Sequence, residues 1–127
     1  MNGTNRTGIN VVVIRGTLSG TPAARRLASG SQLLSLEVAT AGPDGTASVP
    51  VAWFDPPASG ATFASGDEVV VRGMVKRRFF RTAAGTQTRT EVVAAEVVGA
   101  SRRRQVERLL GRAVDQIAGV DDVSRAS

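Results

Sequence analysis

This chain of 127 residues contains no cysteine and no histidine. Their absence excludes disulfide frameworks, thiol chemistry and the commonest metal ligands and acid–base groups. No apolar run approaches the ~18 residues that a membrane span requires, and the polar N-terminal residues 1–6 are followed by no apolar signal region. No pair of carboxylates is framed by a catalytic motif. We therefore expect a cytoplasmic protein that has no contact with a membrane, needs no cofactor and is not an enzyme.

Positive charge is abundant but of one kind. The formal net charge is +5, and only one of the 16 cationic side chains, Lys76, belongs to a lysine. Arginine binds phosphate bidentately and stacks on planar groups, so this bias favours a nucleic-acid partner. It is equally typical of a GC-rich coding sequence, because alanine, glycine and valine are also abundant. Both interpretations remain open at this point.

The length and the hydrophobic patterning predict one domain followed by a helix. Residues 1–8 are polar and are expected to be disordered. Residues 9–100 form the domain, 101–118 an amphipathic helix and 119–127 a flexible tail. Within the domain, the alternation and the turn signals predict five strands, a short strand or arm at 23–27, and a weak helix at 55–65. The five strands are expected at 9–18, 33–40, 48–54, 68–81 and 87–98.

Alternation in the third of these strands separates two adjacent aromatic residues. Val49, Val51 and Trp53 share one face, which predicts that the only tryptophan is buried. Phe54 falls on the opposite face and is expected to be exposed. Pro50 indicates an edge or an irregular stretch of strand, because proline cannot donate a ladder hydrogen bond.

The segment 69–81 is the most informative stretch of the chain. Its alternation predicts that Val69, Val71 and Val75 lie in the core. The opposite face carries cations beside a ring, namely Val70, Arg72, Met74, Lys76, Arg78 and Phe80. This mixture suits single-stranded nucleic acid, because cations follow phosphates while rings stack on bases. An edge strand kept soluble by its charges has the same pattern.

Five strands, a weak helix between the third and fourth, and a long hairpin joining the fourth and fifth are typical of one fold class. We expect an all-β protein with a five-stranded oligonucleotide/oligosaccharide-binding (OB) barrel. In that fold the connections after strands one and four flank the ligand groove. The hairpin after strand four is the one that carries the basic, aromatic residues.

The C-terminal residues are expected to form an amphipathic helix on which Ser101 is the N-cap. Val106, Leu109, Leu110, Ala113, Val114 and Ile117 recur at helical spacing and form one apolar stripe. The arginines at 102–104 are badly placed for the helix dipole, which disfavours cations at the N-terminus. A phosphate group, a neighbouring acidic surface or simple solvation would each account for them.

The sequence resembles the bacterial single-stranded DNA-binding protein family over about two-thirds of its length. From Asn10 to Thr40 it follows the family pattern without a gap, through Gly16, Leu18, Pro22, Arg25, Gly30 and the strand end Val38-Ala39-Thr40. A second stretch, 49–99, matches a strand ending in Phe54, a Ser-Gly-Asp turn at 65–67, Gly73 in a valine-rich strand, and the basic hairpin. The order and spacing of these features carry the resemblance, since no single motif is decisive.

The resemblance implies binding of single-stranded DNA with little sequence preference, in replication, recombination or repair. Phe54 and Phe80 match family positions whose rings stack on bases, with Phe79 as a secondary candidate. The nucleic-acid-binding residues that it implies are Arg15, Thr17, Arg25, Phe54, Arg72, Lys76, Arg78, Phe79, Phe80 and Arg81. It also implies a nucleoid-associated homotetramer, with a dimer as the alternative.

The chain departs from the family in three ways. The connection after Thr40 is short and holds no aromatic residue. Ser48 stands where the family usually has a tryptophan at the start of the third strand, and stacking is worth ~1–3 kcal/mol per base. The chain ends in 121–127 without the family's acidic tip, and the predicted helix stands in its place. These departures indicate a specialised paralogue. They also leave a second hypothesis, an OB-fold module that docks on a protein partner through its 101–118 helix.

Overall fold

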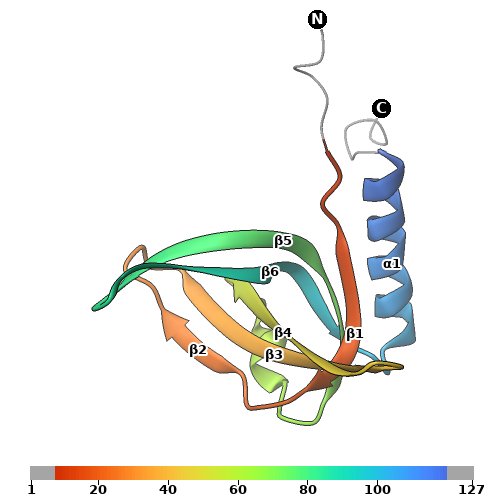
Figure 1. Ribbon diagram of the computed structural model, residues 1–127. Helices are drawn as coiled ribbons and strands as arrows, with labels where there is room; N and C mark the ends of the chain where they lie inside the picture. Colours follow the sequence, from red (N-terminus) through yellow and green to blue (C-terminus); the bar gives the residue numbers. More distant parts are fainter. Residues whose placement is uncertain (1–7, 120–127) are drawn as a thin grey trace, which may run out of the picture.

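Six strands form most of the described structure, which is a computed structural model covering residues 8–119. The strands are β1 (Val12–Leu18), β2 (Ala23–Arg26), β3 (Gln32–Gly42), β4 (Gly45–Phe54), β5 (Glu68–Thr82) and β6 (Gly85–Gly99). A 3₁₀ helix, η2 (Ala58–Thr62), separates β4 from β5, and α1 (Arg103–Ala118) follows β6 (Figure 1). The expected disordered N-terminus and flexible tail lie outside the described residues, apart from Gly8 and Gly119.

The strands close into a five-stranded barrel. They follow the order β1-β5-β6-β4-β3, and β1 pairs with β3 to complete the circle. All of these pairings are antiparallel except that of β4 with β6, which is parallel. β2 is an additional strand that pairs only with β3. A closed mixed barrel with this connectivity and one C-terminal helix is an OB-fold, so the predicted fold class is confirmed.

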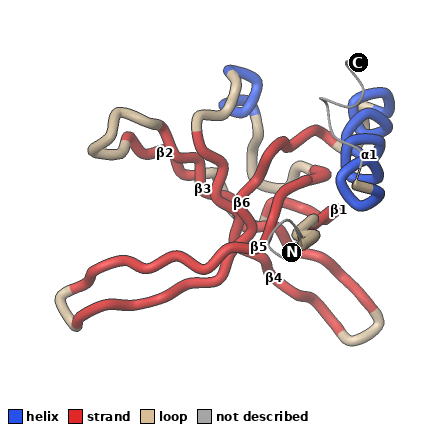
Figure 2. The backbone as a smooth tube through the Cα atoms, turned by 90° about the horizontal axis from the view of Figure 1, so that it is seen from above, coloured by secondary structure: helices blue, strands red, loops and turns tan. Residues whose placement is uncertain are grey.

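Two hairpins extend from the barrel in different directions (Figure 2). β3 and β4 are joined through Pro43 and Asp44, with Gly45 at a φ of 106°. β5 and β6 are joined through Ala83 and Ala84, with Gly85 at a φ of 119°. Positive φ values of this size are accessible to glycine without steric cost, which is why each loop ends at a glycine.

The core lies inside the barrel and follows the predicted alternation. Leu34, Leu36 and Val38 are buried on one face of β3, and Val51 and Trp53 are buried on β4. The Phe63 ring packs against Trp53 with 6.4 Å between ring centroids. The weak helix expected at 55–65 is present as the short 3₁₀ helix η2, and the residue that follows it, Phe63, packs against the core.

Two expectations for β5 and β6 were wrong. Val75 was assigned to the core, but it is 46% exposed, because the pairing of β1 with β5 ends at Gly73. The alternation in β6 is interrupted at Ala95, since Arg72 pairs with Glu96 and Gly73 pairs with Ala94. This bulge shifts the inward face of β6, so that Val92 and Ala94 precede it and Val97 follows it.

α1 packs on the outside of the barrel against β1, β5 and β6. Leu109 and Ala113 are the helix residues buried in this contact. The predicted N-cap was wrong, because the helix begins after Arg102 and no side chain caps it. The helix ends at Gly119, whose left-handed conformation lets its N–H bond the last turn. Within residues 8–119, no helix is both long enough and apolar enough to cross a membrane.

Candidate functional site

A groove of about 220 Å³ lies on the outer surface where the barrel meets the β5–β6 hairpin. Its floor is formed by outward residues of β3 and β4, namely Ser35, Glu37 and Pro50. Gly20, Thr21 and Ala23 form one wall, and Arg78, Arg89 and Glu91 form the other. The connection after β1 and the β5–β6 hairpin therefore flank the groove, which is the arrangement through which OB-folds bind oligonucleotides.

Phe54 is fixed beside this groove at the last position of β4. The next residue, Asp55, has a φ of 48°, and its Oδ1 accepts a hydrogen bond of 2.9 Å from the Gln32 N–H. The Phe54 ring is half-buried and lies under the guanidinium of Arg78, with 5.8 Å between the guanidinium carbon and the ring centroid. Arg78 thus covers one face of the ring, and part of the residue stays exposed.

Arg78 also forms an ion pair with Glu91, whose side chain is only 3% exposed. This pair offsets the repulsion between Arg78 and Arg89, which face each other directly across the hairpin. Glu37 adds a second carboxylate to the groove and accepts a hydrogen bond of 3.1 Å from Ser48 Oγ. The groove therefore holds two positive and two negative groups, so it offers no net attraction to a phosphate.

The outer half of the β5–β6 hairpin, residues 76–91, is called the arm. Its rings are well exposed, Phe79 by 68% and Phe80 by 41%. Alternation places Phe80 on the face of Lys76 and Arg78, and Phe79 on the opposite face. Within the described residues, none of the exposed arm cations forms an ion pair; these are Lys76, Arg77, Arg81 and Arg89. The arm thus combines unpaired cations with exposed rings.

Arg25 lies in the same row of side chains as Phe54. It pairs with Leu33 on β3, and Leu33 pairs with Phe54 on β4. Directly paired residues share a face, so Arg25 is two strand spacings, ~10 Å, from Phe54. The structure therefore places Arg25 on the same face as Phe54.

Arg15 and Thr17 occupy a second depression, of about 480 Å³, where β1 crosses β3. Ala39 lines this depression and Glu37 lines the groove, and both are outward residues of β3. The two hollows therefore follow each other along one strand. The Nε of Arg15 lies 3.0 Å from the Glu68 carboxylate, which neutralises part of its charge.

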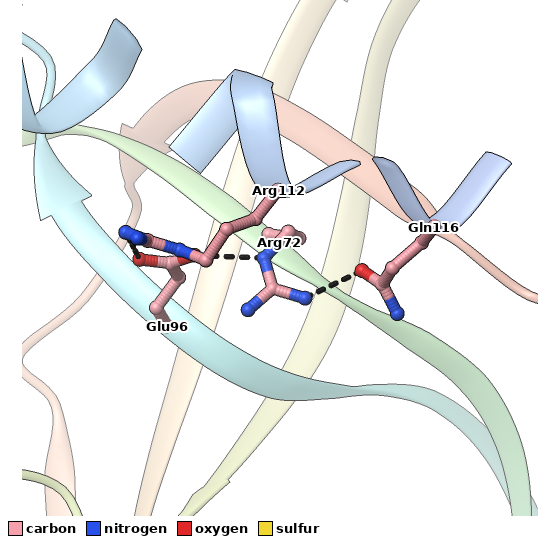
Figure 3. A network of polar contacts seen from close by, with 4 residues as sticks. All are labelled: Arg72, Glu96, Arg112 and Gln116. Atoms are coloured by element: carbon pink, nitrogen blue, oxygen red, sulfur yellow. Dashed lines mark hydrogen bonds and ion pairs between the residues drawn. The ribbon is translucent and has the colours of Figure 1, made fainter. Parts of the chain in front are cut away.

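Arg72 is not brought together with the arm. Its Nε donates to Glu96 Oε2 at 2.7 Å, and its Nη1 donates to Gln116 on α1 (Figure 3). Arg112 on α1 binds both oxygens of the same carboxylate at 2.7 and 2.8 Å. The hydrogen bond from Arg112, assisted by Arg72, holds the pKa of Glu96 below its ordinary value despite partial burial. Arg72 therefore links α1 to the sheet.

Charged groove residues were missed in the sequence analysis. Arg89 lines the groove, yet it was not among the predicted binding residues. The register could have identified it, because a hairpin that turns through Ala83 and Ala84 places Arg89 opposite Arg78. Glu91 was also missed, since nothing in the alternation of β6 distinguishes a buried carboxylate from an exposed one.

Among the described residues, no group of acidic side chains is arranged to hold a metal ion. Neither a scan against protein-family models nor a search of the curated proteins finds a match for this chain. The class is therefore defined by the structure, as an OB-fold barrel with a long basic, aromatic hairpin and a helix on its outer face.

Proposed function

We propose that the protein binds single-stranded DNA with little sequence preference and without catalysis. The observation that supports this most strongly is that the unpaired cations and the exposed rings lie on the arm, whereas the charges of the adjacent groove cancel. The arm presents Lys76, Arg77 and Arg81 with no internal partner, beside the exposed rings of Phe79 and Phe80. The Phe54 ring lies beside the adjacent groove, under Arg78, and the charges of the groove cancel.

This arrangement fits the two parts of a nucleotide separately. Unpaired guanidinium and ammonium groups attract phosphates and release their counterions. Rings accept any base by stacking, because every base has a π-face. The carboxylates of Glu37 and Glu91 oppose phosphate in the groove, which favours the entry of bases there and the passage of the backbone along the arm.

Single strands fit this surface better than duplex DNA. Bases in a duplex are stacked on each other and their faces are closed to Phe54 and Phe80. A role in replication, recombination or repair, at exposed strands near the nucleoid, follows from this preference and from the resemblance in sequence.

The proposal is tested by removing charge from the arm. The double variant Lys76→Gln/Arg81→Gln is titrated against a labelled oligothymidylate of about 35 nucleotides. Its control, Arg104→Gln/Arg108→Gln, removes two exposed cations from α1 instead. We expect the arm variant to bind at least ~10-fold more weakly at low salt and the control to change binding little. Equal losses in both variants would mean that the DNA responds only to net charge.

A further inference from the structure

Most exposed large apolar residues of the described structure fall into two groups. Phe79 and Phe80 lie on the arm and belong to the proposed DNA surface. The second group lies on β1, β5 and α1, and consists of Val13 at 41%, Met74 at 44%, Leu110 at 43%, Val114 at 61% and Ile117 at 56% exposed. Ile9, before β1, and Val75, on the other face of β5, belong to neither group. Neither the fold nor the DNA proposal uses this second group.

The second group forms one continuous surface. The polar edge of α1, Arg112 and Gln116, is bound over β6 and β5 by Glu96 and Arg72. The opposite edge, which carries Leu110, Val114 and Ile117, is therefore directed towards β1, with which α1 is also in contact.

On β1, Val13 pairs directly with Arg72, so it lies beside the helix. Figure 1 shows β1 running alongside α1 on this side of the barrel. These five residues form the apolar centre of the surface, and a standard interface of ~800 Å² per partner includes a polar rim around such a centre.

We propose that this surface is the contact between two copies of the chain, related by a two-fold axis, with their α1 helices antiparallel. The spacing of the stripe is self-complementary in this arrangement. When Leu110 of one copy faces Val114 of the partner, Val106 lies within one residue of the level of the partner's Ile117. The partner's helix then covers the bare outer face of β1 beside α1, where Val13 is exposed.

The charges of α1 also favour a second copy of the chain as the partner. Arg103 and Arg104 lie in the first turn, which contains no acidic residue, and they oppose the positive end of their own helix dipole. In an antiparallel pair they lie towards the C-terminal end of the partner's helix, whose free carbonyls carry partial negative charge. Pairing thus gives the arginines of the first turn a favourable interaction with the partner's helix dipole, which offsets the unfavourable one with their own. The stripe itself carries no charge, so it does not suit a phosphate backbone.

The first test is the mass of the particle in solution without DNA. Val114→Glu places a carboxylate in the centre of the stripe, and Gln105→Glu places one at an exposed position of the same helix away from the stripe. We expect sedimentation equilibrium to give an oligomer for the wild type and for Gln105→Glu, and at most half that mass for Val114→Glu. A wild-type monomer at about 100 µM, or an unchanged mass for Val114→Glu, would overturn the proposal.

Cross-linking tests the direction of the helices. The chain has no cysteine, so an introduced thiol is unique. In the antiparallel pair the two copies of Leu110 lie near the axis, whereas the two copies of Ile117 are separated by about 16 Å along it. A bismaleimide spanning about 8 Å should therefore join Leu110→Cys subunits efficiently and Ile117→Cys subunits at least ~10-fold less. Equal yields would indicate parallel helices, and no yield for Leu110→Cys would exclude this contact.

Discussion

At the scale of single residues, two neighbouring aromatic side chains lie in different environments. Trp53 is 4% exposed and belongs to the core, while Phe54 is half-buried under Arg78 at the groove. Trp53→Ala should lower the free energy of unfolding by about 3–5 kcal/mol, because it leaves a cavity where the ring packs on Phe63. Urea denaturation followed by circular dichroism measures this. A stable Trp53→Ala protein that has lost DNA binding would reverse the assignment of the two faces.

Phe80 is the residue whose ring is expected to stack on a base. Phe80→Ala should weaken binding of a thymine oligonucleotide by about 1–3 kcal/mol, or roughly 5- to 150-fold, and leave thermal stability unchanged. Phe79→Ala is the matched comparison, since it removes the same kind of ring, which is even more exposed, from the opposite face of the arm. We expect the smaller loss for Phe79→Ala, measured by fluorescence anisotropy. A larger loss for Phe79→Ala would place the DNA strand on the other face of the arm.

At the scale of elements, the bulge in β6 depends on a glycine in β5. A Cβ on Gly73 would lie 2.2 Å from the Val93 carbonyl oxygen, so the two strands approach too closely for any side chain. Gly73→Ala should therefore cost about 2 kcal/mol or more in the free energy of unfolding. Gly42→Ala is its control, because a Cβ there meets nothing closer than 3.9 Å, and it should change stability by less than ~0.5 kcal/mol. Equal effects in chemical denaturation would refute this account of the bulge.

The attachment of α1 depends on pH through Glu96. Its pKa is lowered in the folded state from 4.5, chiefly by the hydrogen bond from Arg112. The stabilisation is therefore present above 4.5 and is lost as the pH falls through the folded-state pKa. Glu96→Gln should cost about 2 kcal/mol near pH 7, and the difference from wild type should shrink as the pH falls below 4.5. Glu107→Gln, an exposed position on α1, is the control in urea titrations at several pH values.

The elements also show where prediction from sequence succeeds and where it fails. The strands, the OB barrel and the buried face of β3 follow from alternation and turn residues, which are local signals. The bulge at Ala95 was missed because it depends on a neighbouring strand rather than on its own residues. Arg72 was grouped with the arm for the same reason: alternation gives the face of a strand correctly, but not which helix covers part of that face.

At the scale of the whole molecule, the proposed function predicts a steep dependence on salt. Outside the groove, the arm has three cations with no internal partner, Lys76, Arg77 and Arg81. If each neutralises one phosphate of a single strand, the slope of log affinity against log salt should be about −2. Arg81→Gln should reduce its magnitude by ~0.7, and Arg108→Gln on α1 should not change it. A slope that does not respond to Arg81→Gln would remove the arm from the DNA path.

The most direct test of the central claim compares single-stranded with duplex DNA. A labelled oligothymidylate of about 35 nucleotides and a duplex of the same length are titrated with the wild-type protein at ~50 and ~200 mM salt, with anisotropy as the readout. We predict tight binding to the single strand at ~50 mM, binding to the duplex at least ~10-fold weaker, and a large loss of both at ~200 mM. No binding to the single strand at low salt, or equal affinity for the duplex, would contradict the proposal.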